Sequence, residues 1–440
     1  MLLWMALTLL IFGSAAMAVY HYRRHEHDRQ DVVRMQELAT QPLADRSSRQ
    51  GDWPQWRGPN RDGVAVQDGF RTDWPATGPT LLWQKESGDS HASFAIVRGR
   101  LFTTFREAQT EVIVCWHANT GAEIWRYSSP CSYENEHGSG PRATPVVDGD
   151  YVYAVGASGM MHCLKALTDQ PQGELVWKKD LVREFQAEIP KWGVSFSPLV
   201  DGPCVYVQPG GPHGNSLVAL DKLTGAVVWR QHGDAASYSS PVSATLAGQR
   251  QILFFTASRL VSVDPQTGAA VWEYPWPSDQ QCNIATPIVA KDYVFISSGH
   301  GPGCAVLKVE KSGETWQAVL VYQHRRMRNH FSTCVRHQDH LYGFDHGILT
   351  CMDFRTGKIL WKERGFDKGT VLLVNDQLLI YGENGVVALA DANSAKYQER
   401  ARFTFSTRRA GWSVPVVANG RLYLRDQDKV ACFEVGPTER

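Results

Sequence analysis

The residues best suited to hold a ligand lie in loops, most of them just before a recurring Ser-Pro, Thr-Pro or Val-Pro dipeptide. They carry imidazole, guanidinium, amide, phenol and indole groups, which bind polar ligands or stack on planar ones. The candidates are His91, His137, Arg142, Trp192, Tyr238, Asn283, Arg326, Arg328, Asn329, His330 and Trp412. We expect them to converge on a funnel that binds a ligand or a partner. The alternative is a solvated rim without a ligand, because single loop histidines such as His137 and His330 are more often plain polar residues.

Catalytic signatures are absent from the sequence. It has no Gly-x-Ser-x-Gly elbow, no Gly-x-x-x-x-Gly-Lys-Ser/Thr loop and no His-Glu-x-x-His helix. Calcium needs several oxygen ligands and proton abstraction needs a positioned base. Apart from Glu134 and Glu136, the candidate loops contain few Asp or Glu residues that could meet these requirements. We therefore assign no catalytic residue and no metal ligand.

A strand–turn–strand repeat must position these loops. In Ala219–Trp229, an apolar run enters a turn at Asp221, Gly225 supplies a positive φ, and a β-rich run follows. Similar copies end at Trp125, Trp177, Trp272, Trp316 and Trp361. The turn glycines are Gly121, Gly173, Gly225, Gly268, Gly313 and Gly357, at spacings of 52, 52, 43, 45 and 44 residues. Such a period, with strands, predicts the blades of a β-propeller.

The Ser/Thr-Pro motif runs in phase with the turns and starts each unit, so each blade is expected to hold four strands. Units end at Trp125, Trp177, Trp229, Trp272, about Tyr322 and Trp361, and a seventh spans about 369–403. The last unit, 412–435, lacks one strand, which Leu81–Lys85 can supply to close the ring. The prediction is an all-β, eight-bladed propeller, with seven blades as the alternative.

These residues resemble a known family. The Asp-x-x-Thr-Gly-x-x-x-Trp hairpin resembles the pyrroloquinoline-quinone (PQQ) type propeller repeat, and Trp53–Gly63 looks like the opening signature of bacterial PQQ-like propeller proteins of the planctomycete type. The resemblance covers about residues 51–436. It implies the propeller fold, but its members include both quinoprotein alcohol dehydrogenases and a non-enzymatic scaffold of the outer-membrane-protein assembly machine. The dehydrogenases share an adjacent Cys-Cys pair, a tryptophan platform and a calcium site, and this sequence has no such Cys pair.

Composition excludes some functions. The formal net charge is zero, so no bulk basic surface for nucleic acid is expected. Nine cysteines include no CxxC pair, and several fall in a small-residue slot of the blades. One isolated disulfide among the others remains an open alternative.

The aromatic, Pro-rich stretch 51–75 predicts a plug against one end of the propeller, with a docking surface as the alternative.

The N-terminal segment predicts attachment to a membrane. Residues 1–20 contain no charged side chain and are long enough to span a bilayer, and residues 21–50 are a polar tether. Ala16–Ala18 also resembles a signal-peptidase site. Arg23, Arg24 and Arg29 favour a cytoplasmic location for the rest of the chain, whereas the family resemblance implies an exported, periplasmic propeller. We expect an uncleaved anchor with the propeller outside the cytoplasm.

The sequence therefore predicts a membrane-tethered, monomeric, non-catalytic propeller (51–436) that binds a protein partner in the cell envelope. No cofactor is expected. The alternative is a quinoprotein-like oxidoreductase or small-molecule binder that uses the funnel, with PQQ and calcium as its cofactors.

Overall fold

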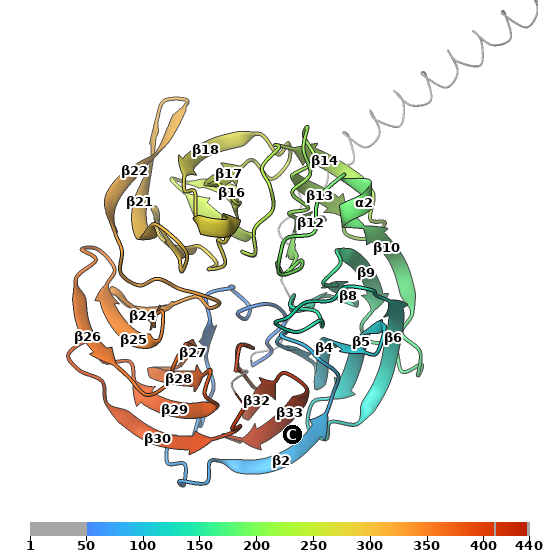
Figure 1. Cartoon of the computed structure of the whole chain (residues 1–440), viewed down its shortest axis with the longest axis vertical. Helices are drawn as coiled ribbons and strands as arrows, with labels where there is room; N and C mark the ends of the chain where they lie inside the picture. The colour runs from blue at the N-terminus through green and yellow to red at the C-terminus, as the bar shows by residue number, and fades with distance from the viewer. Residues whose placement is uncertain (1–50, 409–410, 438–440) are drawn as a thin grey trace, which may run out of the picture. The chain divides into compact units, whose positions relative to one another are not determined.

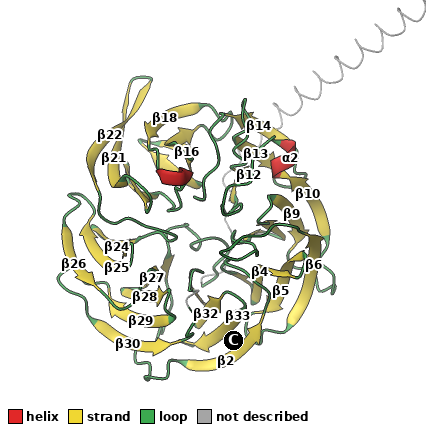
Figure 2. Cartoon of the chain, in the orientation of Figure 1, coloured by secondary structure: helices red, strands yellow, loops and turns green. Residues whose placement is uncertain are grey.

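The computed structural model describes residues 51–408 and 411–437 and arranges them as eight sheets in a ring (Figure 1). Strands dominate these residues, and the helices are short pieces, α2 (Leu181–Glu184) and the 3-10 turn η1 (Asp279–Gln281) (Figure 2). Each blade contains four antiparallel strands, which follow chain order from the axis outward except in blade 8, and the sheet of blade 7 gains a fifth strand from the N-terminal segment. The predicted eight-bladed propeller of four-stranded blades is thus confirmed.

The first four blades use strands β3 to β18. Their bounds are β3 (Ala95–Val97), β4 (Arg100–Glu107), β5 (Thr110–His117) and β6 (Glu123–Pro130) in blade 1; β7 (Val146–Asp148), β8 (Tyr151–Val155), β9 (Met160–Lys165) and β10 (Leu175–Asp180) in blade 2; β11 (Leu199–Asp201), β12 (Cys204–Val207), β13 (Leu217–Asp221) and β14 (Val227–Gln231) in blade 3; and β15 (Val242–Leu246), β16 (Gln249–Phe255), β17 (Arg259–Val263) and β18 (Ala270–Pro275) in blade 4.

The remaining blades follow the same order. Their bounds are β19 (Ile288–Ala290), β20 (Tyr293–Ser298), β21 (Gly303–Ser312) and β22 (Thr315–His324) in blade 5; β23 (Val335–His337), β24 (His340–Asp345), β25 (Ile348–Asp353) and β26 (Ile359–Glu363) in blade 6; β27 (Gly369–Val374), β28 (Gln377–Gly382), β29 (Val386–Asp391) and β30 (Glu399–Thr404) in blade 7; and β31 (Val416–Ala418), β32 (Arg421–Asp426) and β33 (Lys429–Glu434) in blade 8.

The N-terminal strand β2 (Thr80–Glu86) completes blade 8. It pairs antiparallel with β33, from Thr80 opposite Glu434 to Glu86 opposite Lys429. The predicted closing strand is therefore confirmed, and it joins the beginning of the ring to its end. Strand β33 therefore has a partner on both sides, and β2 rather than β33 forms the outer edge of blade 8.

The indole of the outermost strand fastens one blade to the next. In blade 2, Nε1 of Trp177 donates to the carbonyl oxygen of Lys222 over 3.0 Å, and Gly225 lies against the ring. Gly225 has a φ of +70°, as predicted. The same donation to a carbonyl of the neighbouring blade recurs from Trp83, Trp125, Trp229 and Trp361. The Thr-Gly-x-x-x-Trp repeat therefore joins blades as well as forming hairpins.

Blades 4 and 5 depart from this pattern. In blade 4, Nε1 of Trp272 donates within its own blade, to Oε1 of Gln251 over 2.8 Å. In blade 5, Gly313 and Trp316 fit the repeat in sequence, but no described atom lies within 4 Å of a Cβ built on Gly313. Tyr322 takes the fastening position instead, and its hydroxyl donates to the carbonyl oxygen of Phe354 over 3.0 Å. The hairpin of β21 and β22 is therefore longer, with 10 residues in each strand, and it projects from the rim of the ring (Figure 1).

Hydroxyl groups at the start of the inner strands link consecutive blades near the axis. In each link a backbone N–H of one blade donates to the Ser or Thr side chain that precedes the inner strand of the next. These bonds run from Ser93 to Thr144, from Thr144 to Ser197, from Ser197 to Ser240 and from Thr286 to Thr333, over 2.9 to 3.1 Å. The Ser/Thr-Pro motif thus contributes to ring closure, because its hydroxyl satisfies a backbone donor that would otherwise be buried and unpaired.

Residues 53–65 form a plug along the axis. Trp53 is 1% exposed and exchanges two backbone hydrogen bonds with Ile96 of blade 1. Strand β1 (Val64–Ala65) runs parallel to β27 of blade 7. Nε1 of Trp56 donates to Oγ1 of Thr286 in blade 5 over 3.0 Å. The plug thereby connects blades that are far apart around the ring.

Two buried arginines hold the plug in place. Arg57 donates to the carbonyl oxygens of Thr333 and Cys334 of blade 6, over 3.2 and 2.7 Å. Arg61 donates to the carbonyl oxygens of Ser197 and Pro198 of blade 3, over 2.9 and 2.8 Å. Burial lowers the pKa of Arg57 to about 10, so this guanidinium remains charged at neutral pH.

The predicted membrane segment 1–20 and tether 21–50 lie outside the described residues. Within residues 51–408 and 411–437, no helix has the length and hydrophobicity required to cross a bilayer. All nine cysteines fall in the described part of the chain, where each is buried and free.

Candidate functional site

A cavity of about 360 Å³ lies where the loops that enter the inner strands converge. We call it the funnel cavity. It is lined by Trp56, His91, His137, Arg142, Trp192, Ser195, Tyr238, Ser240, Cys282, Ile284, His300, His330, Phe331, Lys368 and Trp412. Trp56 belongs to the plug, so the segment that fills the axis also contributes one wall of this cavity.

Seven of the sequence candidates line this cavity. They are His91, His137, Arg142, Trp192, Tyr238, His330 and Trp412. His137 and Arg142 come from the same loop, and the other five come from loops of different blades. The loops converge because all of them connect an outermost strand to the innermost strand of the next blade, and these connections share one face of a propeller.

The other four candidates do not line the cavity. Asn283 and Asn329 are fully buried, and their amide nitrogens donate to the carbonyl oxygens of Thr256 and Phe344. Arg328 donates to a carboxylate oxygen of Asp345 over 2.7 Å. Arg326 is exposed and is not part of the lining. The two asparagines thus stabilise their loops rather than offering amides to a ligand.

Three prominent residues of the lining were not among the sequence candidates. Trp56 comes from the plug, and His300 lies in the glycine-rich connection between β20 and β21. Lys368 immediately precedes β27, the inner strand of blade 7, which has no Ser/Thr-Pro motif. Treating the position before every inner strand as equivalent would have identified Lys368.

Aromatic rings form a continuous series around the cavity. Phe331 stacks on Trp412 with ring centroids 5.3 Å apart, and His91 lies 5.1 Å from the same indole. On the other side Trp192 stacks on His300 at 6.2 Å, and His300 contacts His330 at 4.8 Å. These rings offer flat, apolar faces on which a planar group can stack.

The permanent charges of the lining are all positive. Arg142 and Lys368 contribute cations, and no Asp or Glu lines the cavity. Burial lowers the pKa of His91 to about 4, and burial together with Lys368 and the neighbouring histidines lowers the pKa of His330 to about 3. Both rings are therefore neutral at pH 7.

Acidification is expected to destabilise the protein through His91. Its folded pKa of about 4 lies below the ordinary value of 6.5, so the unfolded chain binds the proton more readily. The stabilisation is complete above pH 6.5 and is lost as the pH falls from 6.5 towards 4, by about 2 kcal/mol at pH 5.

The measurement is the melting temperature at pH 7 and pH 5 for the wild type and for His91→Gln, which keeps a donor for the carbonyl oxygen of His137. The variant should lose less stability on acidification. Buried acids with raised pKa, such as Glu111, act in the opposite direction but equally in both proteins. If the melting temperature falls by the same amount in both proteins between pH 7 and pH 5, His91 is not the group responsible.

Calcium does not fit this lining. A protein calcium site uses about six to eight oxygen ligands, several of them carboxylates. The side-chain oxygens of the funnel cavity are the hydroxyls of Ser195, Tyr238 and Ser240. Across residues 51–408 and 411–437, no group of three or more His, Cys, Asp or Glu is arranged to hold a metal ion.

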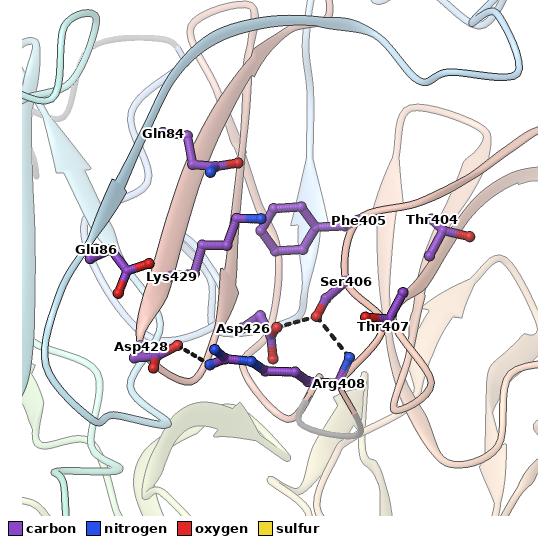
Figure 3. Close-up of a pocket in the computed structure, with 10 residues that line it drawn as sticks. All are labelled: Gln84, Glu86, Thr404, Phe405, Ser406, Thr407, Arg408, Asp426, Asp428 and Lys429. Atoms are coloured by element: carbon purple, nitrogen blue, oxygen red, sulfur yellow. Dashed lines mark hydrogen bonds and ion pairs between the residues drawn. The ribbon is translucent and has the colours of Figure 1, made fainter.

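A second depression, of about 340 Å³, lies between blades 7 and 8 (Figure 3). Its charges have both signs. Arg408 pairs with Asp428 over 2.6 Å, and the hydroxyl of Ser406 donates to the carboxylate of Asp426. Lys429 lies over the ring of Phe405. Because Glu86, Asp426 and Asp428 accompany Arg408 and Lys429, this groove has no excess of positive charge, in contrast to the funnel cavity.

The hairpin repeat, the eight-bladed ring and the loop-lined funnel define the chain as a β-propeller of the PQQ-like type. The family described as "Outer membrane protein assembly factor BamB" matches residues 110–363, and the chain belongs to this family.

Individual relatives include proteins with different names. The chain is 25% identical to the outer membrane protein assembly factor BamB of Shewanella oneidensis over 284 residues, 61% of this chain and 67% of the relative. It is 29% identical to a polyvinylalcohol dehydrogenase of Sphingopyxis over 199 residues, 40% of this chain, but these cover only 24% of that protein. Among solved structures, BamB from Moraxella catarrhalis matches with a TM-score of 0.56 at 16% identity, over 81% of this chain and 97% of that one. This structural likeness supports the fold alone.

Proposed function

We propose that this chain is a non-catalytic propeller that binds a protein partner in the cell envelope and takes part in the assembly of outer-membrane proteins. The observation that carries the proposal is the projecting strand β22 of blade 5. Relatives named for outer membrane protein assembly support the choice of process.

Strand β22 offers both apolar side chains and free backbone groups. It is the last strand of its sheet, so one of its edges has no strand partner among the described residues. Val319, Leu320 and Val321 are 39%, 45% and 44% exposed. Val319 and Leu320 lie next to each other in the regularly paired part of β22, before the bulge at Val321, so their side chains point to opposite faces and each face exposes an apolar group there. An extended segment of a partner protein can add to such an edge, with backbone hydrogen bonds for affinity and side-chain contacts for specificity.

Leu320→Lys is expected to reduce the recovery of outer-membrane assembly proteins with the tagged full chain by about tenfold, since a lysine in an apolar contact costs more than about 1.4 kcal/mol. The matched control is Leu223→Lys. Leu223 is 46% exposed and lies in the hairpin turn of blade 3. The control should retain wild-type recovery, and both variants should keep the wild-type melting temperature.

Two results would contradict this proposal. One is equal loss of partners in both variants, which would point to a general effect of charge. The other is that the wild-type chain, isolated from its own envelope, brings down no component of the outer-membrane assembly machinery.

We further infer that residues 1–20 anchor the chain in a membrane, with the propeller on the extracytoplasmic side. The support is their length without a charged side chain and the family to which the chain belongs. In the same preparation, the full chain should stay with the membranes after alkaline extraction and be digested by protease added outside the inner membrane. A chain lacking residues 1–20 that behaves identically would exclude the anchor.

A second candidate function, small-molecule binding, is favoured by the funnel cavity itself. The quinoprotein form of this candidate lacks support because the lining supplies no carboxylate for calcium.

A further inference from the structure

We propose that the funnel cavity binds a small organic anion with a planar aromatic body, of which an aromatic carboxylate is the simplest example. This inference goes beyond the protein-binding function and uses a different part of the molecule. It rests on uncompensated positive charge, an unpaired hydrogen-bond donor, and aromatic faces around a cavity of ligand size.

The two cations of the lining have no carboxylate partner. The guanidinium of Arg142 donates to the carbonyl oxygens of Gly138, over 2.5 Å, and Gly140. The ammonium of Lys368 lies 3.3 Å from Nε2 of His330. Neither cation forms an ion pair with any described residue. Cations withdrawn from water without a counter-charge favour an anion that enters beside them.

Two carboxylates close to the lining accept hydrogen bonds from groups behind it. Asp89 accepts the backbone N–H groups of Ser139 and Gly140, over 2.5 and 2.9 Å. Glu383 accepts the indole N–H of Trp412 over 2.7 Å. These acids orient the loop and the indole, and they leave the cavity surface itself without a negative group.

His330 supplies an unpaired donor. An ammonium group can only donate, so Nε2 of His330 accepts from Lys368 and the ring proton lies on Nδ1. This Nδ1–H is buried and has no hydrogen-bond partner among the described residues. A buried donor without a partner is costly. Because this nitrogen has almost no accessible surface, an acceptor on a ligand would remove that cost once the imidazole turns towards the cavity.

The volume of the cavity and its aromatic lining indicate the size and shape of the ligand. A volume of about 360 Å³ falls at the small end of ligand pockets, which span about 300 to 1,000 Å³. The stacked pair Phe331 and Trp412 and the stacked pair Trp192 and His300 present ring faces. A flat aromatic anion satisfies both the rings and the cations, whereas a bare inorganic anion would leave the ring faces without contact.

The test compares 2-naphthoate with the neutral 2-naphthamide, which has the same body, on the purified full chain. Binding is followed by quenching of tryptophan fluorescence and by calorimetry. We expect naphthoate to bind at least about tenfold more tightly, because only the carboxylate interacts with the cations.

The variant Lys368→Met should weaken naphthoate binding by about tenfold and leave naphthamide binding unchanged, since one of the two cations is removed. The control Lys308→Met removes the same charge from an exposed pair with Glu310 on β21 and should change neither probe. Equal affinity for the two probes, no saturable binding of naphthoate, or an unaltered naphthoate affinity in Lys368→Met would each overturn the proposal.

The outcome is separable from that of the protein-binding test. Lys368→Met should still recover the partner of β22, and Leu320→Lys should still bind naphthoate, because the hairpin of blade 5 does not line the funnel cavity.

Discussion

Valine in place of Gly225 is expected to lower the free energy of unfolding by about 4 kcal/mol, from two separate causes. Gly225 has a φ of +70°, a conformation in which a β-branched residue is strained by about 1 to 3 kcal/mol. Its new Cβ would also lie 2.8 Å from Cδ2 of Trp177, so the indole that fastens blade 2 to blade 3 would have to move. Overpacking of this kind costs about 1 to 3 kcal/mol.

Gly149→Val separates the two causes. Gly149 has a φ of +58°, but no described atom lies within 4 Å of the position that a Cβ would take there. It should therefore show the backbone strain alone, and the difference in stability between the two variants measures the contact with Trp177. Calorimetric unfolding of the full chain provides the comparison. Equal losses of stability in both variants would show that Gly225 is required for its backbone conformation and not for the packing of the Trp177 indole.

Arg57→Met is expected to destabilise the protein by about 3 kcal/mol, because methionine fills a similar volume but donates no hydrogen bond. Arg57 is 2% exposed and donates to four backbone carbonyls, those of Arg61, Asp62, Thr333 and Cys334. Without the guanidinium these acceptors stay buried and unpaired. Part of this loss of stability is offset because the variant no longer buries a charged group.

The control for this prediction is Arg71→Met. Arg71 is an exposed arginine that pairs with Glu434 on the surface, so its removal should cost less than about 1 kcal/mol. Because Trp56 adjoins Arg57 and lines the funnel cavity, Arg57→Met should also weaken naphthoate binding. If the melting temperatures of the two variants are the same, the plug does not depend on its buried arginine.

The blade count was predictable because the repeat consists of residues with fixed structural tasks. A turn that needs a positive φ selects Gly225, and a socket beneath the next turn selects Trp177 or its equivalents. The lone strand near Trp83 was recognisable because the last unit was one strand short and the ring needed closing. These constraints act within a short stretch of chain, where sequence carries most information.

Blade 5 shows where this argument fails. Gly313 and Trp316 match the repeat, yet the hairpin is longer and Tyr322 occupies the fastening position. Which of two aromatic residues fills a socket depends on the neighbouring blade, and this contact is not visible in the local pattern. The exposed strand that results from the longer hairpin was therefore unforeseen.

The sequence predicted where the funnel lies but only some of the residues that line it. Loop position indicated which residues reach the correct end of the ring, and Trp192, His330 and Trp412 are found there. The direction of a side chain in an irregular loop does not follow from its position, so Asn283 and Asn329 turn into their blades instead. Trp56 was associated with a plug, and nothing in its surroundings indicated that the plug reaches the cavity.

The pairing of β2 with β33 has a consequence for how the chain is made. Strand β2 leaves the ribosome early but finds its partner only when the last strand has been synthesised, so the ring cannot close while the chain is still growing. Until then the unpaired backbone of β2 and the indole of Trp83, which packs against the core of the closed ring, are exposed to aggregation and proteolysis. We therefore expect production of this protein to depend on a holding chaperone, and a chain cut short before Lys429 to be a substrate for degradation rather than a seven-bladed propeller.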